Sequence, residues 1–213
     1  MIAIFGGGEI ATKGIRPVVH DDCWIVDQDV RCYPQIYDLM AAMRPTTVIV
    51  TAGVSHPKTI AESDPADWQH EISVNLLGSY NVAKAAVDVG VTNLIFIASV
   101  AGLYGKPNHS GYSASKGGII SLVQSLAMEG HHAWAISPGR VDTTMREADY
   151  PGEDPRTRLD PKEIGVVVQS LLDGHVEPGA NVIVRKIGFD VYRRVDRGEP
   201  WRTWLKVGEP VVV

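Results

Sequence analysis

The chain has 213 residues, of which 45% are hydrophobic, and its formal net charge at pH 7 is −5. This length and hydrophobic content are typical of a single globular domain with a sizeable core. Because the sequence has no run of basic residues, we expect neither nucleic acid nor an anionic membrane surface as a partner.

Apolar runs alternate with helical patterns along the chain. Strands are predicted at residues 1–5, 23–27, 46–53, 92–99, 132–139 and 181–188. Helices are predicted at residues 9–19, 33–43, 64–90, 111–130 and 160–174. In the longest helix, Asp64 is a candidate N-cap, Pro65 suits the first turn and Gly90 suits the end.

Strands separated by helices predict parallel pairing through crossover helices. We therefore expect a doubly wound, mostly parallel α/β sheet of the Rossmann-like type, with about six strands and helices on both faces. Residues 1–188 would form this domain. The charged, proline-bearing stretch 146–161 is predicted to be a mobile surface loop.

The segment 189–213 is predicted to be a C-terminal extension that packs on the domain or on an oligomer interface. Its apolar side chains at Trp201, Trp204 and Val211–Val213 favour packing over a disordered tail.

The sequence also bears on the compartment. The glycine-rich start does not fit a signal peptide, and no apolar run approaches the roughly 20 residues of a membrane span. Cys23 and Cys32 lack a paired spacing, and the seven histidines are scattered. We expect a cytoplasmic protein without a metal site.

The stretch "FGGGEIA" follows the first strand and opens a helix. Gly6, Gly8 and Ala11 match the G-x-G-x-x-G/A spacing, which places a dinucleotide pyrophosphate against backbone N–H groups at a helix N-terminus. Three glycines after a strand also fit a simple turn. Asp27, at the end of the second strand, is the candidate acid for the ribose hydroxyls.

Weaker signals lie at other strand ends. Ala52 and Gly53 end the third strand and Ser99 ends the fourth, so both reach the carboxyl edge where ligands bind in open α/β sheets. Each also fits an ordinary turn or cap. Asn75 lies inside the long helix. It fits a buried core residue whose amide is hydrogen-bonded, and it also fits a residue of a functional site.

Tyr112 and Lys116 are four residues apart at the start of a helix, so their side chains are neighbours. The arrangement fits an exposed Tyr–Lys contact. It also fits an ammonium that lowers the pKa of a phenol, so that the phenol can transfer protons near neutral pH.

Taken in order, these motifs resemble the short-chain dehydrogenase/reductase family over residues 1–188. The resemblance comprises the glycine turn, "TAG" (51–53), "NLLG" (75–78), Ser99 thirteen residues before the tyrosine, "YSASK" (112–116) and "SPGRVDT" (137–143). It implies a catalytic set of Asn75, Ser99, Tyr112 and Lys116. It implies a cofactor-binding set of Gly6, Gly8, Asp27, Ala52, Gly53, Tyr112, Lys116, Pro138, Gly139, Val141 and Thr143.

The resemblance also implies individual roles. Tyr112 would be the general acid/base, Ser99 would hold the substrate oxygen, and Asn75 would hold a water that links Lys116 to solvent. The cofactor would be NAD or NADP.

The chain departs from the family in length. Only one strand lies between the glycine turn and "TAG", where the family has two. If this strand is the family's second, Asp27 binds the ribose and favours NAD; if it is the third, Asp27 lies near the adenine. Two interpretations of Lys13 and Arg16 are open: they bind the 2′-phosphate of NADP, or they are solvated residues of the helix.

The glycine turn also differs from the family's usual form. Phe5 stands in place of a threonine, and Ile10 and Thr12 stand in place of two glycines.

The predicted substrate wall includes Leu103, Tyr104 and His109, with Tyr150 the only aromatic in a polar lid at residues 144–159. His109 also fits an exposed loop position. Gly117 and Gly118, inside a helix, indicate a close approach of a helix or the cofactor. By resemblance we expect a homodimer or homotetramer.

The predicted function is an NAD(P)-dependent oxidoreductase that interconverts an alcohol and a ketone or aldehyde, with a small-molecule substrate. Two alternatives stay open: a nucleotide-sugar epimerase or dehydratase of the same family, and a dinucleotide-binding regulator without turnover.

Overall fold

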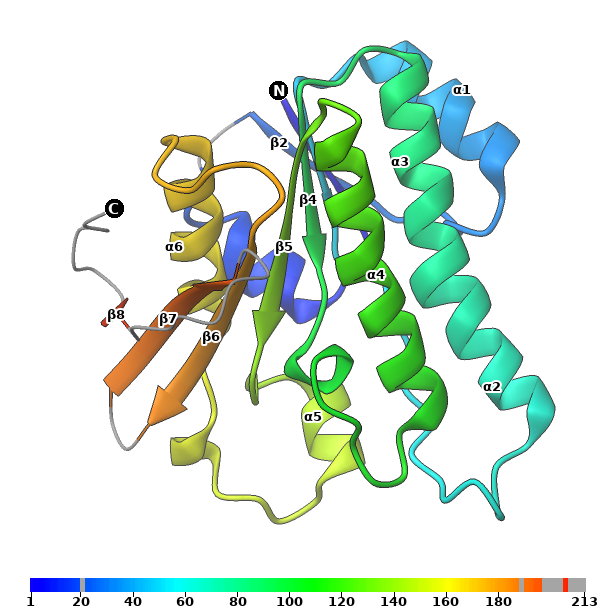
Figure 1. The fold of residues 1–213 in the computed structure, drawn as a ribbon, viewed down its shortest axis with the longest axis vertical. Helices are drawn as coiled ribbons and strands as arrows, with labels where there is room; N and C mark the ends of the chain where they lie inside the picture. Colours follow the sequence, from blue (N-terminus) through cyan, green and yellow to red (C-terminus); the bar gives the residue numbers. More distant parts are fainter. Residues whose placement is uncertain (20–21, 188–189, 197–204, 207–213) are drawn as a thin grey trace.

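The computed structural model describes residues 1–19, 22–187, 190–196 and 205–206, and only the backbone of the last two segments. One sheet runs through the molecule in the order β2-β1-β3-β4-β5-β6-β7-β8 (Figure 1). The parallel strands are β1 (Ile2–Phe5), β2 (Cys23–Val26), β3 (Thr47–Val50), β4 (Asn93–Ile97), β5 (His132–Pro138) and β6 (Asn181–Ile187). The predicted α/β fold with six parallel strands is confirmed.

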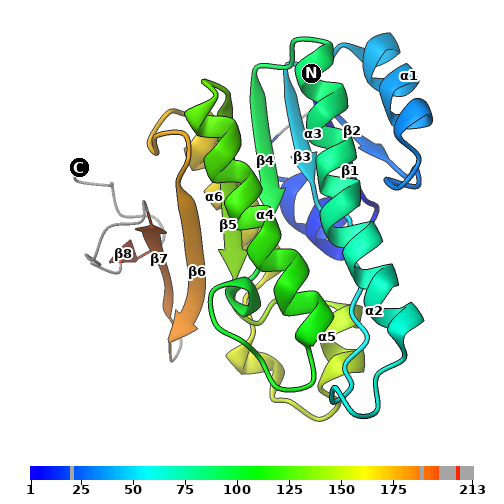
Figure 2. The same ribbon diagram turned by 45° about the vertical axis from the view of Figure 1, so that its right-hand side comes forward.

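Helices cover both faces of the sheet (Figures 1 and 2). The first face carries α1 (Tyr33–Met43), α3 (Gly78–Asp88) and α4 (Ser110–Met128), and the second carries the π-helix η1 (Ile10–Ile15) and α6 (Pro161–Leu172). Each face has its own apolar core. Successive side chains along a strand point to opposite faces of the sheet, and here both faces are covered. This explains why the strands are apolar at nearly every position.

The helices η1 and α6 cross at very short range. A Cβ atom added at Gly14 would lie 2.4 Å from the Pro161 carbonyl oxygen, and one at Gly165 would lie 2.5 Å from the Gly14 carbonyl oxygen. Any larger residue at either position would force the two backbones apart, so this pair fixes α6 against the helix that follows the glycine turn.

The predicted helix at 64–90 is interrupted by a π-helical turn. It consists of α2 (Pro65–Glu71), the π-helix η2 (Ile72–Leu77) and α3. As predicted, Asp64 caps it by accepting a hydrogen bond from the Ala66 N–H at 2.8 Å, and Pro65 occupies the first turn. Gly90 follows the helix with φ of +78°. The π turn holds Asn75, which is fully buried.

The sheet continues beyond the sixth strand. β7 (Asp190–Asp196) pairs antiparallel with β6, and β8 (Leu205–Lys206) pairs antiparallel with β7. Part of the predicted extension at 189–213 thus adds strands to the sheet edge. Trp201, Trp204 and Val211–Val213 lie outside the described residues.

Strand register brings the ends of the central strands to one edge. Phe5 lies beside Val50, Val50 beside Phe96, and Ile97 beside Ile136. The third strand ends at Val50, so the segment 51–53 belongs to the loop beyond this edge rather than to the predicted strand. Among the described residues, no helix is long and apolar enough to span a membrane.

Candidate active site

Ser99 and Tyr112 form the centre of the site. Ser99 follows β4 in an extended conformation and caps the short 3-10 helix η3 (Val100–Gly102), where its Oγ accepts the Ala101 N–H at 3.1 Å. The Ser99 side chain also acts on the Tyr112 phenol, in the first turn of α4, and lowers the pKa of that phenol. The serine at the end of β4 and the phenol at the start of α4 are therefore neighbours at the carboxyl edge of the sheet.

Burial raises the pKa of Tyr112 to about 12, and the hydrogen bond from Ser99 offsets this only in part. The negative charges of Asp149 and Glu71 raise the pKa of the phenol further, while Arg146 lowers it. Tyr112 is therefore a protonated phenol at neutral pH in this structure.

Lys116 lies one helical turn after Tyr112 and is 3% exposed. Its Nζ donates a hydrogen bond to the Ile97 carbonyl oxygen at 2.8 Å, and it lies 5.6 Å from the centre of the Tyr112 ring. Burial lowers the pKa of Lys116 to about 8. The two side chains share a helix face, and the pKa of Tyr112 is raised rather than lowered in this structure, with burial as the largest cause.

Asn75 joins two segments of the site. Its Oδ1 accepts the Val54 N–H at 2.8 Å, and its Nδ2 donates to the Val54 carbonyl at 3.0 Å and to Ser115 Oγ at 3.1 Å. The Ser115 hydroxyl in turn donates to the Tyr112 carbonyl. Asn75 thus fastens the loop after β3 to the helix that carries Tyr112 and Lys116.

Gly53 faces this group directly. A Cβ atom at Gly53 would lie 3.4 Å from both Asn75 Oδ1 and Lys116 Nζ. The structure therefore brings Gly53 together with the two predicted catalytic residues, and it accounts for a residue without a side chain at the end of the "TAG" segment.

The glycine turn packs against the same segment. Gly6 has φ of +115°, a conformation that favours glycine, and its Cβ would lie 2.6 Å from the Ala52 nitrogen. A Cβ at Gly8 would meet nothing within 4 Å. The turn is therefore closed toward the "TAG" loop and open above Gly8.

Asp27 lies beside the glycine turn. The strand β2 pairs directly with β1, and a Cβ at Gly7 would lie 3.8 Å from the Asp27 carboxylate. In the Rossmann order 3-2-1-4-5-6 the neighbour of the first strand on this side is the second strand. By its place in the sheet, β2 thus matches the second-strand alternative.

The segment from Pro138 to Thr143 approaches the turn from the other side of the edge. Pro138 ends β5, and the Gly139 N–H donates to the Val184 carbonyl at 2.7 Å. Val141 is buried in the core of the second face, and Thr143 caps α5 (Thr144–Asp149) by accepting the Arg146 N–H at 3.2 Å.

A direct contact joins this segment to the glycine turn. The Thr144 N–H donates to the Glu9 carboxylate, which also pairs with Lys13 at 2.6 Å. Both contacts lower the pKa of Glu9. Lys13 is thus paired within its own helix and does not face the site as a free cation for a 2′-phosphate.

The stretch after Thr143 differs from the predicted mobile loop. It contains α5 and the 3-10 helix η4 (Pro155–Thr157), and a bridge between Val141 and Leu159 closes its base. Its centre is Arg158, whose side chain is 2% exposed.

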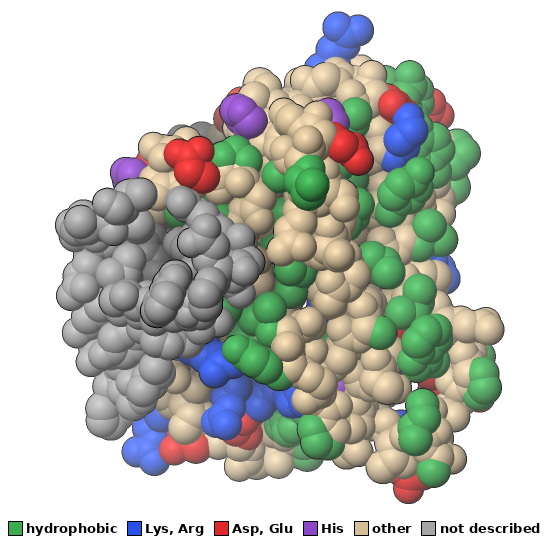
Figure 3. Space-filling model, in the orientation of Figure 1, with side chains coloured by type: hydrophobic (Ala, Val, Ile, Leu, Met, Phe, Trp, Pro, Cys, Tyr) green, Lys and Arg blue, Asp and Glu red, His purple; other side chains and the backbone are tan. Residues whose placement is uncertain are grey.

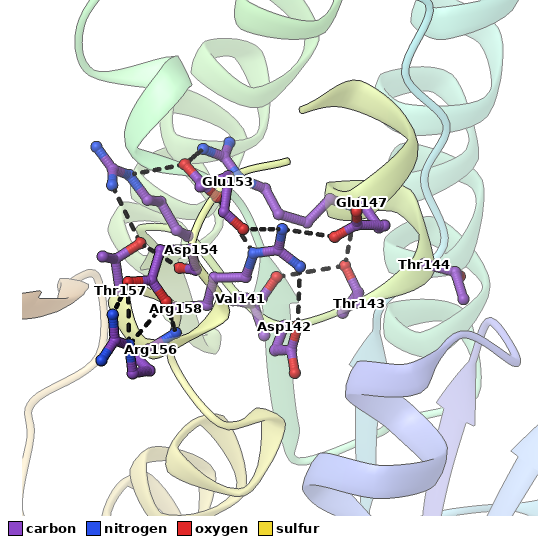
Figure 4. A network of polar contacts seen from close by, with 12 residues as sticks. Val141, Asp142, Thr143, Thr144, Glu147, Glu153, Asp154, Arg156, Thr157 and Arg158 are labelled. Atoms are coloured by element: carbon purple, nitrogen blue, oxygen red, sulfur yellow. Dashed lines mark hydrogen bonds and ion pairs between the residues drawn. The ribbon is translucent and has the colours of Figure 1, made fainter. Parts of the chain in front are cut away.

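Figure 4 shows the guanidinium of Arg158 among three carboxylates. It lies 3.0 Å from Asp142, 2.6 Å from Glu147 and 3.3 Å from Glu153. The charged, proline-bearing composition predicts only a loop here, because nothing in the sequence marks one of its three arginines as buried.

The three residues of the predicted substrate wall differ in their surroundings. Leu103 packs against the core of the first face, and Tyr104 is exposed. His109 is only 4% exposed, so the alternative of a simply exposed loop residue is wrong for it. Its ring stacks on Tyr150 at 5.7 Å and meets the Tyr112 ring edge-on at 6.2 Å.

The helical glycines have a packing cause. A Cβ at Gly117 would lie 3.1 Å from the Gly102 carbonyl oxygen, and one at Gly118 would lie 2.8 Å from the Leu76 side chain. The expected close approach is therefore between α4 and the neighbouring elements η3 and η2.

A family model described as short chain dehydrogenase matches residues 15–154 of the chain. This match covers more than half of the sequence and includes Asn75, Ser99, Tyr112 and Lys116. The chain belongs to the short-chain dehydrogenase family. The family predicted from the sequence motifs is thereby confirmed.

Curated relatives of this short-chain dehydrogenase include several reductases and dehydrogenases. A 3-oxoacyl-(acyl-carrier-protein) reductase of Mycobacterium tuberculosis is 30% identical over 158 residues, which cover 69% of this chain and 62% of that protein. The human (3R)-3-hydroxyacyl-CoA dehydrogenase is 31% identical over 126 residues, covering 55% and 48%. The chain spans about half the length, or less, of the first curated relatives it matches.

Solved structures show the same fold. A short chain dehydrogenase from Escherichia coli CFT073, complexed with NADPH, aligns with a TM-score of 0.68 at 25% identity, covering 76% of this chain and 73% of that chain. A short chain dehydrogenase from Salmonella enterica serovar Typhi aligns with a TM-score of 0.68 at 25% identity, covering 85% and 84%.

Proposed function

We propose that this short-chain dehydrogenase is an NAD(P)-dependent oxidoreductase that interconverts an alcohol and a ketone or aldehyde. The placement of Ser99 and Tyr112 together at the carboxyl edge of β4, where the serine side chain lowers the pKa of the phenol, carries the proposal. It pairs a proton donor with a hydroxyl that can hold a carbonyl oxygen. The names of the curated relatives, which are reductases and dehydrogenases, support the same reaction class.

The residues present fit a dinucleotide. The turn is open above Gly8, Gly6 brings the first strand against the "TAG" loop, and Gly53 leaves space in front of Lys116. A bound nicotinamide would supply or accept the hydride, while the protein supplies orientation and proton transfer. The residues that would hold the dinucleotide are Gly6, Gly8, Asp27, Ala52, Gly53, Tyr112, Lys116, Pro138, Gly139, Val141 and Thr143.

The electrostatics favour the reducing direction for Tyr112. A phenol with a pKa of about 12 stays protonated at neutral pH, which is the form that donates a proton to a carbonyl oxygen. Ser99, fixed by the Ala101 N–H, orients that oxygen. Lys116, held by the Ile97 carbonyl, and Asn75, held by Val54, fix the position of α4 beneath the phenol.

For the choice of cofactor, we propose a preference for NAD(H). The Asp27 carboxylate beside Gly7 suits ribose hydroxyls and repels a 2′-phosphate. The neighbouring structure that holds NADPH is a different protein at 25% identity, and it does not decide the preference of this chain.

Fluorescence titration of NADH and NADPH, followed by a screen of small carbonyl compounds for loss of nicotinamide absorbance, tests both proposals. We expect tighter NADH binding, and Asp27→Asn should move the preference toward NADPH. Dinucleotide binding without turnover of any carbonyl or alcohol would contradict the oxidoreductase and favour a regulator. An unchanged preference in Asp27→Asn would contradict the role of Asp27.

We also propose a homodimer or homotetramer in the cytoplasm. Large hydrophobic side chains are exposed along the helix 65–88, at Trp68, Leu77 and Tyr80, and Figure 3 shows hydrophobic side chains on the face that this helix forms. Both cysteines are unpaired, which suits a reducing compartment. Light scattering after gel filtration measures the oligomer, and a monomer at micromolar concentration would contradict it.

A further inference from the structure

We propose that Lys106 recognises a negatively charged group, a carboxylate or a phosphate, on the carbonyl substrate. This inference rests on the proposed oxidoreductase function and adds the substrate class. It comes from the position of Lys106 at the end of a row of rings that begins at Tyr112, and from the absence of a carboxylate within 4 Å of its ammonium among the described residues.

Lys106 lies at the end of a row of rings that begins at the proton donor. The Tyr112 ring meets His109 edge-on, and His109 stacks on Tyr150 with an angle of 4° between the ring planes. The Lys106 ammonium lies 4.2 Å from the centre of the Tyr150 ring. The loop that carries Lys106 follows Ser99, so this cation belongs to the wall around the Ser99–Tyr112 pair.

The four arginines of residues 140–158 are each paired with a carboxylate. Arg146 binds Glu153 through two nitrogens, at 2.8 and 2.5 Å, and Arg140 lies 3.4 Å from the same carboxylate. The Arg158 guanidinium has three carboxylates (Figure 4).

Among the described residues, no carboxylate lies within 4 Å of the Lys106 ammonium, which lies over the face of the Tyr150 ring. A ring face attracts a cation without neutralising its charge.

The half-buried position makes this unpaired charge costly. Burial lowers the pKa of Lys106, and the positive charge of Arg146 lowers it further, whereas the negative charges of Asp149 and Glu153 raise it. A protein gains little from such a cation in its own packing, because partial burial without a counter-ion is unfavourable. An anionic group on a ligand would supply the missing partner.

The position of Lys106 restricts the substrate geometry. A carbonyl oxygen bound between Ser99 and Tyr112 would place the rest of the substrate along His109 and Tyr150, toward the ammonium. Oxo acids and phosphorylated carbonyl compounds combine the two groups. A hydrogen bond to a charged group is worth roughly 10- to 100-fold in binding, so a charged substrate should be preferred over its neutral counterpart by about that factor.

The test compares kcat/KM for charged substrates and neutral partners. The carboxylate arm uses 2-oxobutanoate, 3-oxobutanoate and 4-oxopentanoate against their methyl esters, and the phosphate arm uses dihydroxyacetone phosphate against dihydroxyacetone. At least one charged substrate should exceed its neutral partner. Lys106→Met should reduce that ratio by about 10-fold or more, Lys106→Arg should keep most of it, and Lys162→Met on α6 is the control.

A second readout separates this inference from the proposed function. Saturation-transfer NMR measures binding of 4-oxopentanoate and inorganic phosphate to the protein without turnover. Binding that is lost in Lys106→Met but kept in Lys162→Met supports the anion site even if no carbonyl is reduced. Turnover of neutral carbonyls with no charge preference in any pair, or equal binding to both variants, overturns the inference while the oxidoreductase stands.

Discussion

Replacement of Lys116 by Met should stabilise the protein at neutral pH. Lys116 is 3% exposed, and burial lowers its pKa from 10.5 to about 8. Because one pH unit corresponds to about 1.4 kcal/mol, holding the charged form inside the fold costs about 3 kcal/mol below pH 8. The methionine leaves the Ile97 carbonyl without its donor, which costs about 1 kcal/mol. The net gain in the free energy of unfolding is about 2 kcal/mol.

The gain should depend on pH in a stated direction. Between the folded pKa of about 8 and the unfolded value of 10.5, the unfolded chain binds more protons at Lys116 than the folded protein does. The stability of the wild type therefore rises with pH across this window relative to the variant. Below the window the advantage of Lys116→Met is complete, and near its upper end the advantage disappears.

Urea unfolding followed by tryptophan fluorescence measures this difference at about pH 7 and at about pH 10. Lys162→Met, at an exposed position on α6, is the matched control and should change stability by no more than about 0.5 kcal/mol at either pH. A Lys116→Met variant that is less stable than the wild type at neutral pH, or a difference that does not vary with pH, would refute the reasoning about the buried ammonium.

Three further changes test other parts of the structure. Gly14→Ala pushes a Cβ into the backbone of α6 and should lower the free energy of unfolding by about 1–3 kcal/mol in the same urea assay. Gly105→Ala is the control and should be nearly neutral, because a Cβ at Gly105 meets nothing within 4 Å. Arg158→Met leaves Asp142 and Glu147 without their ion-pair partner and should speed hydrogen exchange across residues 142–159, while the exposed Arg156→Met should not. Equal exchange in both variants would contradict the role of Arg158 as the anchor of the lid. Glu9→Gln removes a negative charge beside the glycine turn and should tighten NADH binding several-fold at low salt; weaker binding in fluorescence titration would count against an anion site there.

The order of short motifs along the chain predicted which residues the fold brings to one edge of the sheet. Gly6, Gly53, Ser99 and Tyr112 all follow strands or begin helices, and parallel strands carry their ends to the same edge of the sheet. Local spacing therefore fixes the relative places of these residues once the alternation of strands and helices is recognised.

Other features depend on contacts that spacing does not encode. The sequence shows Tyr112 next to Lys116, but the pKa of each depends on how much water the fold removes, and here burial dominates both. Likewise, the composition of residues 146–161 indicates a polar loop, whereas one buried side chain, Arg158, organises it. Gly14 is inconspicuous in the sequence until α6 is placed against it.

The central claim is that Tyr112 transfers the proton while Ser99 holds the carbonyl oxygen. The most direct test is the rate of carbonyl-dependent NAD(P)H oxidation in Tyr112→Phe, with Tyr80→Phe on α3 as the control and dinucleotide binding followed by fluorescence in both. We predict that Tyr112→Phe retains dinucleotide binding and loses at least about 100-fold in kcat, while Tyr80→Phe keeps its activity. A Tyr112→Phe variant that turns over at the wild-type rate would contradict the account.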